Sequence, residues 1–144
     1  MELKEYQKKS LEQVKIYLEW LAKAREEANK LKALSSEFAD VQAFEFPKAA
    51  LNKQGALTPY HSKKNGLGED VPDYYIKIPT GGGKTLLACH MIDLINRIYL
   101  KKQTDIVLWI VPTTQIYRQT LANLRNREHP YRQVLDIASA GRTV

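Results

Sequence analysis

Apolar positions recur at helical spacing in the first quarter of the chain. Between residues 3 and 34 charged side chains fill the faces that the apolar ones leave open. The apolar residues of this stripe are Leu11, Val14, Leu18, Leu21, Ala28 and Leu31. The pattern predicts one long amphipathic helix, and Ser10 is the point where it could break. We expect it to lie on the side of a sheet rather than form a coiled-coil arm, because Ala24 and Ala28 make a weak seam.

The second half alternates between two periodicities. Residues 74–78 predict a strand, and residues 83–101 predict a helix with one apolar face. The unbroken apolar run 105–111 is typical of a strand buried on both faces of a parallel sheet. A helix over 113–125 and a third strand over 132–138 complete the pattern. This order predicts an α/β fold with an open parallel sheet.

The middle of the chain is rich in proline and glycine and lacks a clear period. We therefore divide the sequence into a helical segment, a loop-rich linker and a sheet-forming region, at residues 1–34, 35–73 and 74–144. A linker this long is uncommon in a compact domain unless it is functional or packed elsewhere. Phe38, Phe44 and Phe46 are the expected anchors of its first part.

The uneven distribution of charge along the chain bears on the kind of partner that it could bind. The 144 residues carry a net charge of +6, and the whole excess lies in residues 74–144, with 10 Lys+Arg against 4 Asp+Glu. This imbalance favours a polyanionic partner and a solubilising surface equally. No stretch approaches the roughly 20 apolar residues of a membrane span. The charged N-terminus is unlike a signal peptide, and the lone Cys89 reads as a core residue, so we expect a cytoplasmic protein without a membrane partner.

The most specific motif is the glycine-rich loop between the first predicted strand and the next helix, Ile78-Pro79-Thr80-Gly81-Gly82-Gly83-Lys84-Thr85. Glycines let backbone N–H groups approach a phosphate, and the following helix N-terminus adds partial positive charge. A lysine can reach the β- and γ-phosphates, and a threonine hydroxyl can ligate Mg²⁺. The strict phosphate-loop pattern fails at Ile78, where its first glycine would stand.

The remaining form, Pro-Thr-Gly-x-Gly-Lys-Thr, resembles that of superfamily 2 helicases and translocases, and it implies a partial RecA-like domain that binds ATP and Mg²⁺. The residues expected to hold the nucleotide are Pro79, Thr80, Gly81, Gly82, Gly83, Lys84 and Thr85. Lys84 and Thr85 are the expected catalytic pair, with Thr85 on the metal. The opening Leu3-Lys4-Glu5-Tyr6-Gln7 resembles that family's Leu-x-x-Tyr-Gln element, which implies that Gln7 reads the adenine edge.

A second polar cluster follows the apolar run 105–111. Its hydroxyl, amide and guanidinium groups resemble motif Ia of the same superfamily, which implies that Thr113, Thr114 and Arg118 contact the backbone of double-stranded DNA. Simple N-capping by Thr113 or Thr114 is the plainer interpretation, and the two roles are compatible. The short stretch 139–143 is a weaker candidate for a further backbone contact.

Most of residues 74–144 resembles the restriction (Res) subunit of type III restriction–modification enzymes, and the resemblance is thin over residues 35–73. That resemblance implies ATP hydrolysis coupled to DNA translocation and cleavage in a longer protein, together with a methylation and specificity (Mod) subunit. No adjacent carboxylate pair follows the run 105–111, so we expect the chain alone to be the inactive front part of a motor domain. Two alternatives are a non-catalytic remnant that binds DNA or a partner, and another DNA-dependent ATPase of superfamily 2.

Overall fold

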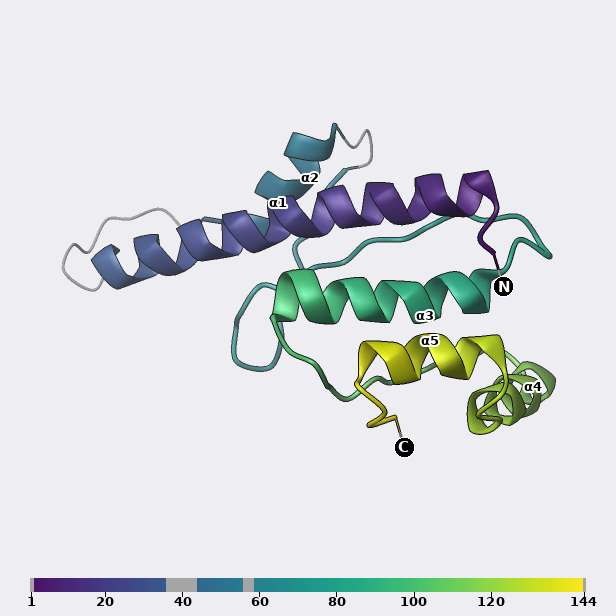
Figure 1. The fold of residues 1–144 in the computed structure, drawn as a ribbon. Helices are drawn as coiled ribbons and strands as arrows, with labels where there is room; N and C mark the ends of the chain where they lie inside the picture. The colour runs from purple at the N-terminus through teal and green to yellow at the C-terminus, as the bar shows by residue number, and fades with distance from the viewer. Residues whose placement is uncertain (1, 36–43, 56–58, 144) are drawn as a thin grey trace. The chain divides into compact units, whose positions relative to one another are not determined.

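The computed structural model describes residues 2–35, 44–55 and 59–143, and in these ranges the regular structure is helical (Figure 1). The elements in chain order are α1 (Glu5–Ser35), α2 (Phe46–Gln54), α3 (Lys84–Leu94), the π-helical turn η1 (Ile95–Leu100), α4 (Thr114–Arg125) and α5 (Pro130–Ala138). None of these helices is both long and apolar enough to cross a membrane. The chain divides into two compact units: one joins the residues up to Val14 with those from Lys77 onward, and the other is Lys15–Ile76.

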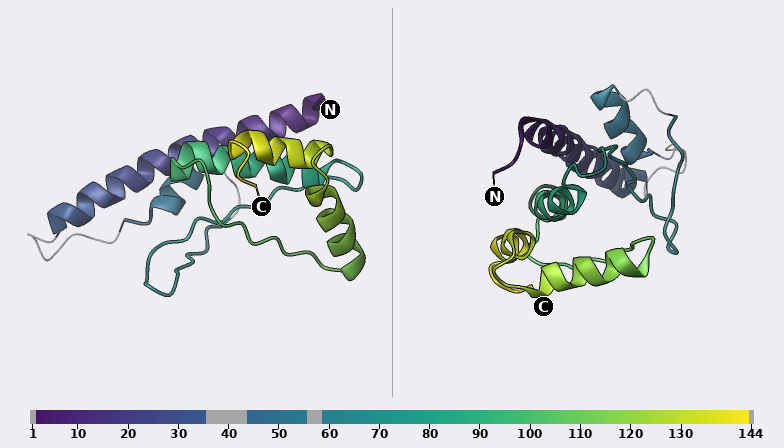
Figure 2. Two further views of the ribbon diagram at one scale, coloured as in Figure 1. Left: turned by 60° about the horizontal axis from the view of Figure 1, so that its bottom comes forward. Right: turned by 90° about the vertical axis from the view of Figure 1, so that its right-hand side faces the viewer.

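The unit that contains the glycine-rich loop is built around α3. This helix packs against α5, and α4 packs against α5 in turn. In both views of Figure 2, α3 and α5 lie side by side while α4 runs across their direction. The buried core of α3 consists of Leu86, Leu87 and Cys89. Because Cys89 is fully buried, its prediction as a core residue is confirmed.

The second unit uses the rest of α1 and the residues up to Ile76. Tyr17, Leu18 and Leu21 form the buried stripe of α1 there, and the Tyr17 ring meets Tyr74 edge-on at 5.3 Å between centroids. Helix α2 begins with the buried Phe46, so this predicted anchor is confirmed.

The other two predicted anchors fare differently. Phe44 is half-buried, and Phe38 lies outside the described residues. Sequence analysis missed α2, although a proline in its first turn and the left-handed Gly55 at its C-cap are the usual helix boundary signals.

The helices predicted over 3–34, 83–101 and 113–125 are confirmed as α1, α3 with η1, and α4. Helix α1 continues through Ser10 without a break. The Ser10 hydroxyl donates a hydrogen bond to the Tyr6 carbonyl at 2.8 Å, which places the side chain within the helix rather than at its end.

The predicted α/β fold with a partial RecA-like parallel sheet is wrong, because the described residues contain no strand. A strand exists only when a neighbouring segment accepts and donates its backbone hydrogen bonds. Residues 74–78 and 105–111 make no such ladder among the described residues. The run 105–111 was expected to be buried on both faces, yet Ile106 is 96% exposed and Leu108 83% exposed.

The third predicted strand is helix α5. Pro130 stands in its first turn, where the missing N–H costs nothing, and the ring nitrogen Nδ1 of His129 accepts a hydrogen bond from the Tyr131 N–H. Arg132 pairs with Asp136 one turn later at 2.9 Å. Four-residue charge spacing is a helical signal, and it outweighs the short apolar run that suggested a strand.

Candidate phosphate-binding site

The glycine-rich loop forms a tight turn that leads directly into α3. The Gly82 N–H donates to the Pro79 carbonyl at 3.0 Å, and Gly81 at the third position of this turn has φ of +76°. That φ is the one a type II turn requires. Gly83, the N-cap of α3, is also left-handed, with φ of +77°. Two positive φ values in close succession give the loop its sharp curvature.

Gly82 and Gly83 are crowded for different reasons. A Cβ on Gly82 would lie 2.5 Å from Cγ2 of Ile78 and 2.9 Å from the Pro79 carbonyl oxygen. A Cβ on Gly83 would lie 2.5 Å from the amide nitrogen Nε2 of Gln7. Gly81 has nothing within 4 Å of the same point. The loop is therefore pressed against the start of α1 on one side and against its own entry segment on another.

The first turn of α1 holds the loop by two hydrogen bonds to one atom. Gln7 Nε2 donates to the Gly82 carbonyl at 3.0 Å, and the Tyr6 hydroxyl donates to the same oxygen at 2.9 Å. Gln7 is 5% exposed, and its oxygen Oε1 accepts from the Lys4 N–H at 2.9 Å. The structure thus joins two segments about 75 positions apart that sequence analysis had assigned to one nucleotide site.

The opposite side of the loop offers donors. Among the described residues, the N–H groups of Gly83, Lys84 and Thr85 donate to no protein acceptor, as expected for the first turn of a helix. Lys84 is exposed, and its ammonium donates to the Pro79 carbonyl at 3.0 Å. N–H groups without a protein acceptor, a helix N-terminus and one exposed cation together suit an anion.

Burial keeps the side chains that follow on α3 uncharged. It raises the pKa of the Cys89 thiol to about 11, so the thiol stays protonated at neutral pH. Burial also lowers the pKa of His90, although Asp93 opposes this shift, which favours the neutral imidazole. The positive potential of the loop therefore comes from Lys84 and backbone N–H groups. The described residues hold no cluster of three or more His, Cys, Asp or Glu side chains that could bind a metal ion.

The second predicted site lies at the start of α4. The Thr113 Oγ1 accepts a hydrogen bond from the Ile116 N–H at 3.3 Å, so the N-capping interpretation is confirmed. Thr113, Thr114 and Arg118 are all exposed. No hydrogen bond in the described part of the chain links these three residues to the glycine-rich loop. Their DNA contact stays a prediction.

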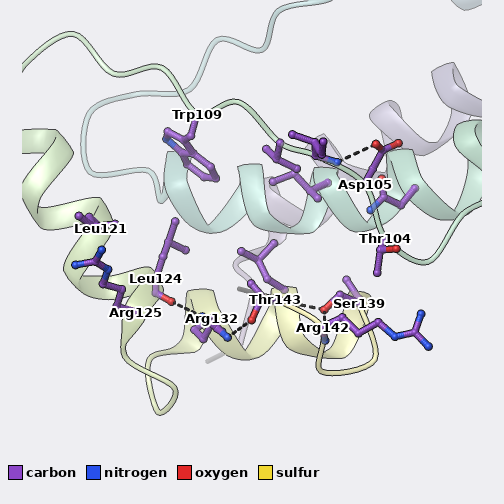
Figure 3. Close-up of a pocket in the computed structure, with 16 residues that line it drawn as sticks. Thr104, Asp105, Trp109, Leu121, Leu124, Arg125, Arg132, Ser139, Arg142 and Thr143 are labelled. Carbon is purple, nitrogen blue, oxygen red and sulfur yellow. Dashed lines mark hydrogen bonds between the residues drawn. The ribbon is translucent and has the colours of Figure 1, made fainter.

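A pocket of about 600 Å³ lies between α3, α4 and α5, away from both predicted sites (Figure 3). Its wall includes Trp109, Leu121 and Leu124, and neither the residues of the glycine-rich loop nor Thr113, Thr114 and Arg118 line it, although Ser139, Arg142 and Thr143 of the weaker candidate stretch do. The Arg132 guanidinium spans one side, donating to Asp136, to the Leu124 carbonyl and to the Thr143 carbonyl. Arg132 is therefore a structural tie between α4, α5 and the segment after α5.

The candidate stretch 139–143 closes a turn after α5 rather than following a strand. Ser139 Oγ and Thr143 Oγ1 share a hydrogen bond at 2.9 Å, and the Arg142 N–H donates to Ser139 Oγ at 3.1 Å. A nucleic-acid role for this turn stays a prediction.

Sequence analysis gave no role to Tyr6. It stands in the quoted element beside Gln7, and its position one residue from a candidate ligand was the only signal available. Only the contact of its hydroxyl with Gly82 makes Tyr6 part of the candidate site.

The family described as "Type III restriction enzyme, res subunit" matches residues 1–143. No curated protein and no solved structure matches the chain.

Proposed function

The chain belongs to the family of type III restriction enzyme res subunits, and on this premise we propose that its glycine-rich loop binds the phosphates of ATP. Membership indicates a helicase-like region of a restriction enzyme. The finer proposal is that ATP hydrolysis drives DNA translocation and cleavage in the full-length enzyme, together with a methylation and specificity subunit.

One observation carries the nucleotide proposal: Gly82 is held by α1 on one side while three N–H groups face away without protein partners. Backbone donors at a helix N-terminus fit a phosphate. A Cβ at Gly82 would clash with Ile78 and Pro79, and one at Gly83 would clash with Gln7, so this loop conformation needs glycine at both positions. In the proposed site Lys84 neutralises the phosphate charge. Gln7 already lies against the loop, where its amide would read the adenine edge after its bond to Lys4 opens.

The donor set also suits Mg²⁺ in a limited way. Mg²⁺ keeps several waters and takes its other ligands from one or two protein oxygens and the nucleotide phosphates. The Thr85 hydroxyl is the protein oxygen that we propose as a ligand at the loop. Bound ATP with Mg²⁺ supplies the scissile phosphoanhydride, and this chain's residues hold and orient it.

The test compares two lysine variants. Lys84→Ala removes the cation of the loop, while Lys77→Ala removes an exposed cation of the same unit just before it. A charge-assisted hydrogen bond contributes about 1.5–3 kcal/mol, so Lys84→Ala should weaken ATP binding about 10- to 100-fold. Isothermal titration calorimetry with ATP and Mg²⁺ measures it. Equal affinity in wild type, Lys84→Ala and Lys77→Ala would rule out the nucleotide proposal.

A second candidate function is DNA binding that does not depend on nucleotide. Helix α4 and its surroundings favour it, because Arg118, Arg125 and Arg127 lie in a stretch from residue 106 to 127 that contains no acidic residue. Phosphate contacts need donors and positive charge rather than base recognition. This candidate matches the non-catalytic remnant considered from the sequence.

The two candidate functions predict different effects of Lys84→Ala on DNA binding in the presence of ATP. Fluorescence anisotropy with duplex DNA should give an affinity that falls steeply with salt, because phosphate contacts release counterions. Arg118→Ala should lower the affinity for DNA and reduce the slope of log affinity against log salt concentration by about one. If ATP changes the affinity for DNA in wild type but not in Lys84→Ala, the proposal of ATP-driven translocation on DNA is supported. If ATP changes the affinity in neither protein, DNA binding that does not depend on nucleotide is the function supported.

A further inference from the structure

Helix α1 contacts the glycine-rich loop through hydrogen bonds to the Gly82 carbonyl. This carbonyl accepts two hydrogen bonds, from the Tyr6 hydroxyl at 2.9 Å and from Gln7 Nε2 at 3.0 Å. A carbonyl oxygen has two lone pairs, so this acceptor is saturated. Gln7 has an assigned role in the proposed site, whereas Tyr6 has none.

The orientation of this carbonyl fixes the neighbouring donor. In a trans peptide the C=O of one residue and the N–H of the next point in opposite directions, and the described chain contains no cis peptide. Because the Gly82 oxygen points toward Tyr6 and Gln7, the Gly83 N–H points away from α1. That N–H is one of the donors without a protein partner.

The same peptide would rotate easily without such restraint. It joins two glycines, and glycine tolerates both signs of φ at little cost. A rotation would turn the Gly82 oxygen toward the incoming phosphate and withdraw the Gly83 donor. Two hydrogen bonds from a helix are therefore a restraint with a direct consequence for anion binding.

We propose that Tyr6 is a positioning residue for phosphate binding, which acts by holding the Gly82–Gly83 peptide with its N–H directed at the anion. The proposal rests on the proposed nucleotide-binding function. Tyr6 is 39% exposed, so its ring contributes little to the core, and its hydroxyl is the group that matters.

The experiment removes that hydroxyl alone. Tyr6→Phe should weaken binding of inorganic tripolyphosphate and of ATP about fivefold, the effect of one hydrogen bond, and leave adenosine binding unchanged. Tyr75→Phe is the matched control, because this tyrosine is 76% exposed, and it should bind like wild type. Isothermal titration calorimetry gives the affinities, and thermal unfolding followed by circular dichroism shows whether the fold is kept.

Lys84→Ala in the same series distinguishes failure of the Tyr6 assignment from failure of the nucleotide proposal. If wild type and Lys84→Ala bind tripolyphosphate equally, the nucleotide proposal fails. If Lys84→Ala loses binding while Tyr6→Phe binds like wild type, the assignment of Tyr6 alone is overturned. Equal losses for tripolyphosphate and adenosine in Tyr6→Phe would also overturn it, since they indicate a general structural defect.

A second variant keeps the test usable if Tyr6→Phe does not fold. Placing 3,5-difluorotyrosine at position 6 keeps the ring and the hydroxyl but makes the phenol ionise at lower pH. A phenolate cannot donate to the Gly82 oxygen, so tripolyphosphate affinity should fall as pH rises toward 9, more steeply than in wild type. Parallel pH profiles for the two proteins would contradict the proposal.

Discussion

Gly83→Ala tests how closely α1 and the loop are fitted. Gly83 has φ of +77°, and an added Cβ would lie 2.5 Å from Gln7 Nε2. The left-handed conformation costs a residue with a Cβ about 1–2 kcal/mol. The Gln7 amide must also move, which weakens its hydrogen bonds to Gly82 and Lys4 at about 1 kcal/mol each. We therefore expect Gly83→Ala to reduce the free energy of unfolding by about 2–4 kcal/mol.

Gly81→Ala is the matched control for this variant. Gly81 has nearly the same φ, +76°, but nothing lies within 4 Å of the added Cβ. Only the backbone strain of about 1–2 kcal/mol applies there. The difference between the two variants therefore isolates the contact with Gln7, and urea unfolding followed by circular dichroism measures both.

A double-mutant cycle completes the test. In a Gln7→Ala background the amide is gone, so Gly83→Ala should cost no more than Gly81→Ala. If Gly83→Ala and Gly81→Ala are equally destabilising in the wild-type background, the close approach of Gln7 to Gly83 has no energetic weight, and the reasoning is refuted.

Three further outcomes are expected. Arg132→Ala should lower the free energy of unfolding by about 2–4 kcal/mol in urea, because the buried guanidinium holds Asp136 and two carbonyl groups; a loss below about 0.5 kcal/mol would contradict the role of a tie. Burial raises the pKa of the Cys89 thiol to about 11, so the stability that the buried neutral thiol contributes is complete below the unfolded-state pKa near 8.5 and is lost as pH rises toward 11. The melting temperature should therefore depend less on pH between 7 and 11 in Cys89→Ala than in wild type. Identical slopes of melting temperature against pH in the two proteins would contradict this prediction. Thr113→Val should cost about 1 kcal/mol through loss of the N-cap of α4, and Thr113→Ser should restore it; failure of Ser to do so would count against capping.

The helices were predictable because their signals are local. The stripe of α1 and the loop-to-α3 junction depend on residues within a few positions of one another. A sheet depends on hydrogen bonds between distant segments, and an apolar run such as 105–111 does not state whether a partner is present. Arg132 and Asp136 carried a local signal for α5 that the short apolar run obscured.

The candidate site shows the same division. The glycines and Lys84 were selected from their spacing, and Gln7 from a resemblance. The structure places Gln7 against the loop, and its role with adenine stays a prediction. The contact of Tyr6 with Gly82 joins residues 76 positions apart, so no local pattern announces it. Capping of α4 by Thr113, which sequence analysis considered beside DNA contact, could be predicted because capping is a local interaction.

The unequal crowding of the three glycines determines which of them could be replaced without disturbing the loop. Gly82 is constrained by the Pro79 carbonyl, a backbone atom that no exchange of side chains removes. Gly83 is constrained both by its φ and by Gln7, so no single compensating substitution releases it. At Gly81 the space is open, and asparagine or aspartate, which tolerate positive φ, are acceptable replacements there. On packing alone, a side chain is therefore easier to accommodate at Gly81 than at Gly82 or Gly83.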